Sequence, residues 1–282
     1  MSLNPLAYKN LVEQALMEDI GRGIDVTSQS LVTPNKEIKA QIVARQDATV
    51  AGTDVALHCF QALDQSISFK RYIEDGRSVK PGDIISDITG PAHSVVAGER
   101  TALNFLSHLS GIATKTAEYV AQTKGTKASI AATRKTLPGL RALQKYAVLM
   151  GGGQTHRYGL DDGILIKDNH IMANDGDVTK TLNTVLQNKG HMTKLEIEVD
   201  TLDQLQEIIE SSLKVDIVLL DNMSASDLVK AVEISDGQFV LEASGGITLK
   251  NVREIAQTGI DIISIGALTH SVTAIDFGLD MS

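Results

Sequence analysis

The chain of 282 residues has no tryptophan, few other aromatic residues and a single cysteine, Cys59. One cysteine cannot form an internal disulfide, which excludes a disulfide-stapled domain and fits a reducing compartment. Cys59 lies in the apolar run from Val55 to Phe60, so we predict a buried structural thiol. An aromatic content of 4% with a net charge of −9 argues against a nucleic-acid binder, which shows a basic footprint with aromatic platforms.

Long apolar runs are also missing. No stretch approaches the ~20 residues that span a bilayer, and Met1 to Glu18 lacks the basic-then-apolar start of a signal peptide. We therefore expect a soluble, cytoplasmic protein. Hydrophobic residues make up 43% of the chain, which is enough for a sizeable core in one large domain or two.

One basic stretch stands out in this acidic chain. Arg100 to Lys167 holds ten lysines and arginines against three acids, whereas the remainder holds sixteen basic residues and thirty-two acids. Its cations lie next to glycines and strand-like runs, where chain turns would fix them in place. This pattern predicts a pocket for a small molecule with several negative charges.

The pattern of strands and helices changes near residue 95. Before it, helices over 5–19 and 53–63 mix with strands over 38–50, 67–73 and 83–88. Next we expect a helix over 95–109, a break at Gly111 and a second helix to about residue 123. After that, short apolar runs alternate with helical patterns, one of which covers 138–150. The apolar runs lie at 128–132, 163–166, 195–199, 215–220, 239–243 and 261–265. This alternation predicts a parallel sheet, with a closed or nearly closed barrel favoured over a doubly wound sheet.

Each of these runs ends in a chemically useful group. Parallel α/β folds bind ligands beyond the carboxyl ends of their strands, so these groups should meet at one mouth. Glu196 and Glu198 are two apart and point to the same face. Taken singly, each group has an ordinary structural explanation, such as a helix cap for Asp221 or a surface charge for each cation. Gly151 to Gly153 are best explained as a helix stop.

The last two strand ends indicate phosphate. Ser244-Gly245-Gly246 precedes a helix predicted to start near Thr248, and Ser264-Ile265 leads to Gly266. Glycines let the backbone approach an anion, and a helix start offers free N–H donors. Arginine suits carboxylate and phosphate recognition, and lysine supplies a point charge. The candidate cations are Arg100, Arg134, Lys135, His156, Arg157 and Lys167.

Motifs along nearly the whole chain resemble those of the quinolinate phosphoribosyltransferase family, also called carboxylating nicotinate-nucleotide pyrophosphorylase. They include 99–106, 109–114, 133–136, 138–141, 145–148, 151–157, 165–171, 196–199, 219–222, 242–247 and 264–271, with a looser match at 18–21 and 25–28. One departure is Ala132, where the family usually has glycine, and it should perturb a turn at most.

The resemblance implies an α/β fold, with an N-terminal α/β sandwich over 1–110, completed by 271–282, and an incomplete parallel α/β barrel over 111–270. It implies a pentosyltransferase of NAD biosynthesis that converts quinolinate and phosphoribosyl pyrophosphate to nicotinate mononucleotide, pyrophosphate and CO₂ with Mg²⁺. It also implies a homodimer, or a higher oligomer, in which Arg100 reaches the neighbouring site.

The same resemblance assigns roles to the candidate residues. Lys135, Lys167, Glu198 and Asp221 would be catalytic, and Glu198 and Asp221 would hold the metal directly or through water. Substrate would contact these four together with Arg100, Thr133, Arg134, His156, Arg157, Ser244, Gly245, Gly246, Ser264, Ile265 and Gly266.

Three other functions compete with this one. A paralogue of the same fold, such as the one found beside molybdate-transport genes, would act on another substrate. A different phosphate-binding barrel enzyme, such as an aldolase, would need a Schiff-base lysine, for which Lys167 is the candidate. A non-catalytic anion sensor would bind the same ligands without turnover.

Overall fold

The structure is a computed structural model that describes residues 3–21, 23 and 25–281, and the chain divides into two compact units. The first unit comprises residues 1–117, 136–152 and 267–282, and the second comprises residues 118–135 and 153–266. The sequence-based division into 1–110, with 271–282, and 111–270 stays a prediction.

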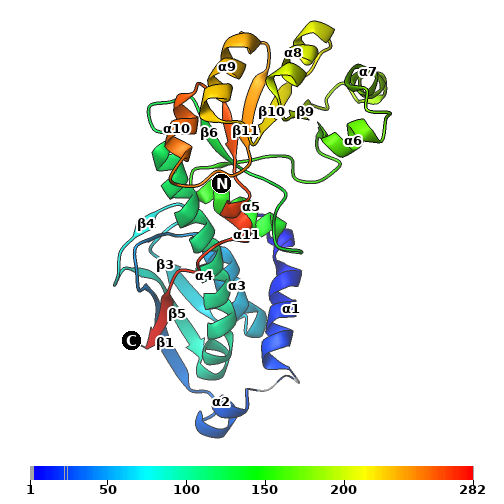
Figure 1. Cartoon of the computed structure of the whole chain (residues 1–282). Coiled ribbons are helices and arrows are strands. Elements are labelled where there is room, and N and C mark those ends of the chain that lie inside the picture. The colour runs from blue at the N-terminus through cyan, green and yellow to red at the C-terminus, as the bar shows by residue number, and fades with distance from the viewer. Residues whose placement is uncertain (1–2, 22, 24, 282) are drawn as a thin grey trace. The chain divides into compact units, whose positions relative to one another are not determined.

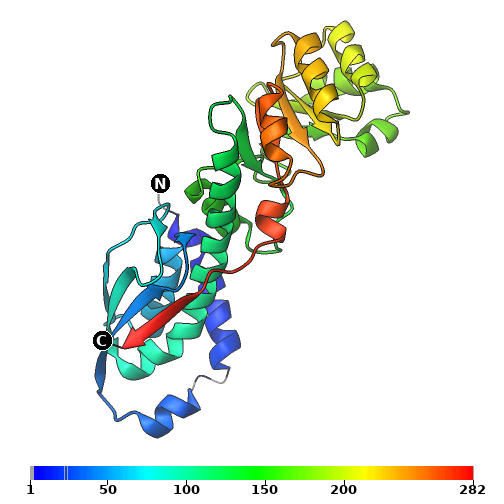
Figure 2. The same cartoon turned by 60° about the vertical axis from the view of Figure 1, so that its left-hand side comes forward.

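The first unit is built around a four-stranded antiparallel sheet with the order β13-β1-β5-β3. Its strands are β1 (Glu37–Ala44), β3 (Ser68–Arg71), β5 (Ile84–Pro91) and β13 (Phe277–Met281), and β2 (Ala48–Thr49) pairs with β4 (Ser78–Val79). Its helical segments are η1 (Pro5–Ala7), α1 (Lys9–Ile20), α2 (Val26–Leu31), α3 (Thr53–Leu63), most of α4 (Ala92–Gln122), α5 (Arg141–Met150) and α11 (Ala267–His270). Both ribbon views show β13, from the end of the chain, lying along β1 (Figures 1 and 2).

The break expected at Gly111 is wrong, because α4 is continuous from Ala92 to Gln122. Gly111 has a packing role instead. A Cβ atom at this position would lie 2.3 Å from the backbone oxygen of Thr273, so the glycine lets the C-terminal segment approach the helix. The stop expected at Gly151 is confirmed, since this residue is the C-cap of α5 and its N–H donates to Ala147 O.

The second unit contains a seven-stranded sheet with the order β7-β6-β12-β11-β10-β9-β8, and all its strand pairs are parallel. The strands are β6 (Ser129–Ala132), β7 (Gln154–Thr155), β8 (Ile164–Ile166), β9 (Leu195–Val199), β10 (Ile217–Asp221), β11 (Val240–Ser244) and β12 (Ile262–Ser264). From β8 to β12 each strand pairs with the next, and β12 then pairs with β6, as in a barrel. Because β7 and β8 are the two ends of this order, the barrel is incomplete, as the resemblance implies.

Helices connect these strands in the way the sequence predicts. They are α6 (Asp168–Met172), α7 (Val178–Asn188), α8 (Leu202–Ser211), α9 (Ala225–Ser235) and α10 (Val252–Gln257). Asp177, Thr201 and Ser224 accept backbone N–H groups at the starts of α7, α8 and α9, so short polar side chains set these boundaries. The short elements α6 and β7 were not predicted, because each is too short to show a period.

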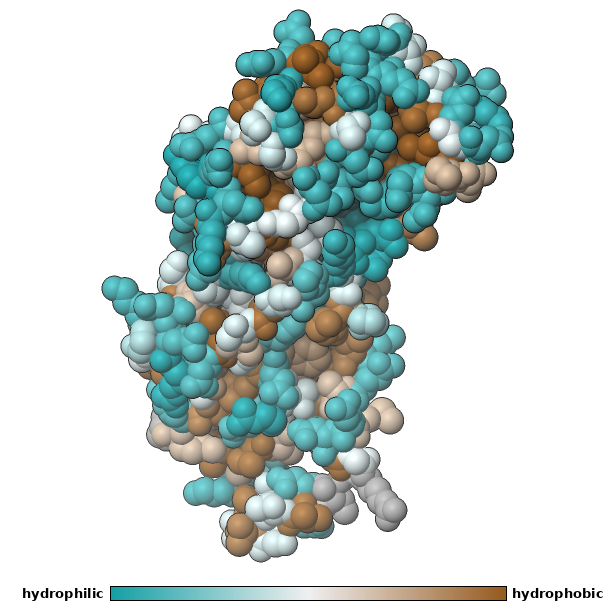
Figure 3. Space-filling view, viewed as in Figure 1, coloured by the Kyte–Doolittle hydropathy of each residue, from teal (hydrophilic) through white to brown (hydrophobic). Residues whose placement is uncertain are grey.

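On the face seen in Figure 3, hydrophilic residues surround separate apolar patches. Within the part of the chain that the structure describes, no helix is both long enough and apolar enough to cross a membrane. Cys59 is fully buried in α3, and burial raises the pKa of its thiol to about 12, so the prediction of a structural thiol is confirmed.

Candidate active site

The polar groups predicted from the strand ends all follow, or lie at the ends of, strands in the second unit. Since every pair in this sheet is parallel, the carboxyl ends share one edge. These residues are Thr133, Arg134 and Lys135 after β6, His156 and Arg157 after β7, Lys167 after β8, Glu198 near the end of β9, Asp221 at the end of β10, Ser244, Gly245 and Gly246 at the end of β11, and Ser264, Ile265 and Gly266 at the end of β12.

Two arginines of this edge lie close enough for their charges to interact. Burial lowers the pKa of the Arg157 guanidinium, and the positive charge of Arg134 lowers it further. Arg157 Nη1 donates to the carbonyl oxygen of Gly163 at 2.8 Å, which fixes one side of the guanidinium. The buried Nε of Arg134 has no hydrogen-bond partner among the described residues. Neighbouring, partly desolvated cations of this kind favour an anionic ligand.

Lys167 and Glu198 form an ion pair between the ends of β8 and β9. The register explains the contact, because Ile166 lies opposite Ile197, and Lys167 and Glu198 are the next residues along each chain segment. Glu198 is largely buried, with 13% of its side chain exposed, whereas Lys167 is 44% exposed. The lysine therefore keeps access to a ligand at this edge.

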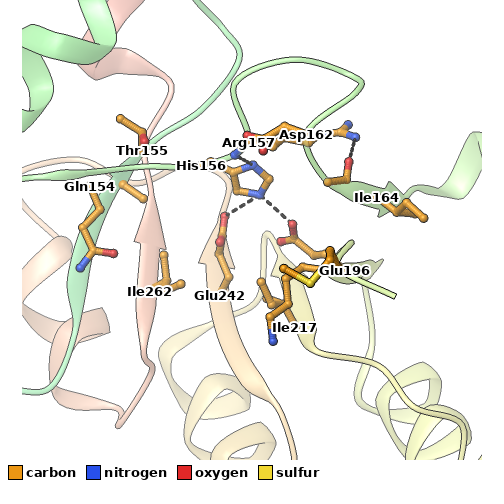
Figure 4. A pocket seen from close by; sticks show the side chains of 14 residues that line it. Gln154, Thr155, His156, Arg157, Asp162, Ile164, Glu196, Ile217, Glu242 and Ile262 are labelled. Atoms are coloured by element: carbon orange, nitrogen blue, oxygen red, sulfur yellow. Dashed lines mark hydrogen bonds and ion pairs between the residues drawn. The ribbon is translucent and has the colours of Figure 1, made fainter. Parts of the chain in front are cut away.

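His156 lies between two buried glutamates (Figure 4). Its Nε2 atom is 2.7 Å from Glu196 Oε2 and 3.8 Å from Glu242 Oε1, and its Nδ1 atom accepts the backbone N–H of Arg157 at 2.7 Å. These residues line a cavity of about 330 Å³ together with apolar side chains such as Ile217 and Ile262. Of the predicted site residues that the structure describes, His156 and Arg157 line this cavity.

Glu196 and Glu242 are the functional candidates that sequence analysis missed. Glu196 was noted as sharing a face with Glu198, and Glu242 appeared within a motif, but neither was assigned a role. The available signal was an acid inside an otherwise apolar strand run, in Leu195–Val199 and Val240–Ser244. A buried acid in such a run needs a partner, which sequence spacing alone does not identify.

Asp221, Asn222 and Gly245 form a compact corner. Asn222 Nδ2 donates to Asp221 Oδ2 at 2.6 Å, and the Asn222 backbone N–H donates to Ser244 O at 2.9 Å. Gly245 has φ +88°, and a Cβ there would lie 2.2 Å from Asn222 Oδ1. Glycine is therefore required at this turn for both conformation and space. The corner holds the Asp221 carboxylate beside the turn that leads to the exposed Gly246.

Thr133 and Ile265 form hydrogen bonds with backbone groups within the second unit, and Arg100 lies in the first unit. Thr133 Oγ1 accepts the N–H of Lys135 at 3.0 Å, and the N–H of Ile265 donates to Ala131 O at 2.9 Å. Arg100 belongs to the first unit, where it lies on α4 with 67% of its side chain exposed and 3.9 Å from Glu99. Its predicted role in a neighbouring site stays a prediction.

Two groups of oxygen and nitrogen donors could hold a metal ion. Donor atoms of His156, Glu196 and Glu242 lie within 4.8 Å of one another. Glu198 and Asp221 lie near the ends of adjacent strands, and the register puts both on one face of the sheet, because Glu198 is opposite Leu219. Two carboxylates beside an open edge fit Mg²⁺, which prefers oxygen ligands and keeps several waters.

Comparison with known proteins matches two consecutive parts of the chain to one family. Residues 25–110 match the N-terminal domain of quinolinate phosphoribosyl transferase, and residues 112–280 match its C-terminal domain. A probable carboxylating nicotinate-nucleotide pyrophosphorylase of Bacillus subtilis is 39% identical over 99% of this chain and 95% of its own. The Mycobacterium leprae carboxylating enzyme is 41% identical over 98% and 97%.

Solved structures agree over the whole chain. The nicotinate-nucleotide pyrophosphorylase of Ehrlichia chaffeensis superposes with a TM-score of 0.92 at 38% identity, covering 100% of both chains. The Francisella tularensis protein gives 0.94 at 37% identity, covering 100% of this chain and 98% of its own. With matches to both of its domains and full-length relatives near 40% identity, the chain belongs to the quinolinate phosphoribosyl transferase family.

Proposed function

We propose that the protein transfers the phosphoribosyl group of phosphoribosyl pyrophosphate to quinolinate, giving nicotinate mononucleotide, pyrophosphate and CO₂ in NAD biosynthesis. Full-length relatives named as carboxylating nicotinate-nucleotide pyrophosphorylases support this activity. The observation that carries it is the proximity of Arg134 to Arg157 at the carboxyl edge of the sheet, where the positive charge of Arg134 disfavours the charged form of Arg157 until an anion binds.

Arg134, Arg157 and Lys167 would hold the two carboxylates of quinolinate, with Arg100 supplied by a partner subunit. Fixing both carboxylates directs the ring nitrogen at the anomeric carbon of the sugar, and this orientation lowers the barrier. The nitrogen forms a bond to that carbon as the bond to pyrophosphate breaks. The ring nitrogen becomes cationic, so it can stabilise the carbanion left when the adjacent carboxylate departs as CO₂, and a proton then replaces that carboxylate.

Glu198 and Asp221 would hold Mg²⁺, directly or through water. When bound, the ion supplies positive charge near the departing pyrophosphate. Lys135 would add a second charge there, since it follows β6 on an exposed turn. Lys167 would release part of its contact with Glu198 to engage substrate.

Ser244-Gly245-Gly246 and Ser264-Ile265-Gly266 would hold the 5-phosphate of the sugar. The positive φ angles of Gly245 and Gly246 turn the backbone sharply after β11, where N–H groups can face an anion. Thr133 would add a hydroxyl contact from the neighbouring strand end. We further propose a homodimer or a higher oligomer and a cytoplasmic location.

The test is a mass-spectrometric turnover assay with phosphoribosyl pyrophosphate, Mg²⁺ and either quinolinate or nicotinate. Quinolinate should yield nicotinate mononucleotide and CO₂ in equal amounts, and nicotinate should yield neither. Turnover of nicotinate without CO₂ would overturn the proposal. Borohydride trapping of a carbonyl substrate on Lys167 would favour an aldolase, and tight quinolinate binding without turnover would favour a sensor.

A further inference from the structure

The segment 156–163 spans the opening of the incomplete barrel. It joins β7 to β8, which lie at opposite ends of the sheet order, so the described strands form no ladder between these two edges. At the start of the segment, the N–H of His156 donates to Ala132 O at 3.0 Å. Just after its end, the N–H of Ile164 donates to Lys194 O at 3.1 Å. Each end is thus fixed to its own strand neighbour, and contacts within the segment can join the two edges.

Two hydrogen bonds close this segment, one inside the other. In the outer bond, Arg157 Nη1 donates to Gly163 O at 2.8 Å, between residues six positions apart. In the inner bond, the backbone N–H of Tyr158 donates to Asp162 Oδ2 at 2.7 Å, between residues four positions apart. The short loop that the inner bond closes has few conformations, so less conformational entropy remains to be lost when the outer bond orders the arginine side chain.

The carboxylate of Asp162 also lies near the guanidinium of Arg157 (Figure 4). Burial is the main cause of the lowered pKa of Arg157, followed by the charge of Arg134, and the negative charges of Glu196 and Asp162 oppose this shift. Arg157 and Asp162 both line the cavity of about 330 Å³. Because Asp162 is exposed, water screens its charge, and its hydrogen bond to the backbone is the stronger reason for a role.

We propose that Asp162 is a positioning residue for quinolinate, which holds the N–H of Tyr158 and so keeps Arg157 against the Gly163 carbonyl, ready for a carboxylate. This inference rests on the proposed function, because that function assigns Arg157 to quinolinate. A guanidinium that is fixed beforehand loses less entropy when substrate binds. Such a contribution lowers the KM for quinolinate without changing the chemical step.

Two variants separate the hydrogen bond of Asp162 from its charge. Asp162→Asn keeps an oxygen that can accept the Tyr158 N–H, whereas Asp162→Ala removes the acceptor. Asp162→Ala should raise the KM for quinolinate about five- to tenfold, which corresponds to the loss of one hydrogen bond. Its kcat and its KM for phosphoribosyl pyrophosphate should change far less, and Asp162→Asn should resemble the wild type. A merely structural defect would instead change all three parameters and would not be rescued by asparagine.

The matched controls are Asp161→Asn and Asp161→Ala. Asp161 is an exposed acid of the same segment that takes part in neither bond, so both variants should have wild-type kinetics. An unchanged KM for quinolinate in Asp162→Ala would overturn the proposal. An Asp162→Asn variant as impaired as Asp162→Ala would overturn it as well, because the charge and not the bond would then matter. A lower KM in Asp162→Ala would show that Asp162 competes with substrate for Arg157.

Amide hydrogen exchange, followed by NMR, tests the inner bond without substrate. The Tyr158 amide should be protected in wild type and in Asp162→Asn, and should exchange about fivefold faster or more in Asp162→Ala. Equal exchange in wild type and Asp162→Ala would overturn the proposal. Failure of the wild-type protein to turn over quinolinate would instead remove the proposed function, and the exchange rates would still decide whether Asp162 holds this segment.

Discussion

Lys167 and Glu198 neutralise each other across the ends of β8 and β9. One is a proposed ligand of the quinolinate carboxylates and the other a proposed ligand of Mg²⁺, so under the proposed function this ion pair would couple the two binding events. Without substrates, the pair lowers the cost of holding the mostly buried Glu198 carboxylate at the open edge. Binding of a carboxylate to Lys167 would free Glu198 for the metal.

Glu198→Gln tests this coupling. The amide keeps the size of the side chain but loses the charge, so the Mg²⁺ concentration for half-maximal activity should rise about tenfold. The melting temperature should change little, because the partner lysine is 44% exposed and such pairs contribute roughly 1 kcal/mol or less. Lys180→Ala, which removes an exposed pair with Asp175, is the control and should leave the Mg²⁺ requirement unchanged. An unaltered requirement in Glu198→Gln would remove Glu198 from the metal site.

Arg157→Ala should lose most quinolinate affinity. A bound carboxylate would lose a charged partner in a partly desolvated place, and kcat/KM for quinolinate should fall about 100-fold or more. Arg157→Lys should recover little, since lysine cannot reproduce the contact to the Gly163 carbonyl together with a second one to substrate. Calorimetric titration with quinolinate and steady-state kinetics measure both effects. The exposed Lys214→Ala is the control, and near-normal binding in Arg157→Ala would exclude this arginine from the clamp.

Much of the second unit could be predicted from the sequence. Its strands are short apolar runs with polar groups at their ends, and the parallel pairing collects those ends at one edge, as the runs ending in Lys167 and Asp221 illustrate. The contacts between buried polar side chains of different strands could not be predicted from the sequence. His156, Glu196 and Glu242 come from three strands or their ends, and their meeting depends on register, which no local pattern encodes.

The error at Gly111 has a different cause. Glycine disfavours a helix interior by about 1 kcal/mol relative to alanine, so a break was the reasonable expectation. The helix continues because the segment around Thr273 packs against this position, and tertiary contact overrides the local preference. A contact with a residue more than 150 positions away leaves no trace in the local sequence.

Gly111→Ala should therefore destabilise the protein although alanine is the better helix former. Its Cβ would meet the Thr273 oxygen at 2.3 Å, and relieving that overlap should cost about 1–3 kcal/mol. Gly190→Ala, at a position outside the helices, is the control for a glycine that has room, since the nearest atom to its Cβ lies at 3.4 Å. Chemical denaturation of both variants compares the free energies of unfolding, and a more stable Gly111→Ala would show that the segment moves aside freely.

Glu242 should also make stability depend on pH. Its pKa is raised from 4.5 to about 7 in the folded protein, chiefly by burial and next by Glu196, so the folded state holds a proton that the unfolded state releases. The stabilisation is complete below the unfolded pKa and is lost as the pH rises through the folded value. Between these pH values the loss is of the order of 3 kcal/mol. The free energies of unfolding of wild type and Glu242→Gln are measured across this pH range, and their difference isolates the contribution of Glu242. A difference that does not change with pH would contradict the raised pKa.

The proposed sharing of Arg100 between subunits predicts complementation. Arg100→Ala and Lys135→Ala homodimers should each be inactive, because every site lacks one cation. In a mixed dimer, one site receives Arg100 from the Lys135→Ala subunit and Lys135 from the Arg100→Ala subunit, and is intact. Random equal mixing after dissociation should therefore restore about a quarter of wild-type activity. Native mass spectrometry verifies that mixed dimers form, and verified mixed dimers without activity would show that Arg100 does not act in the neighbouring site.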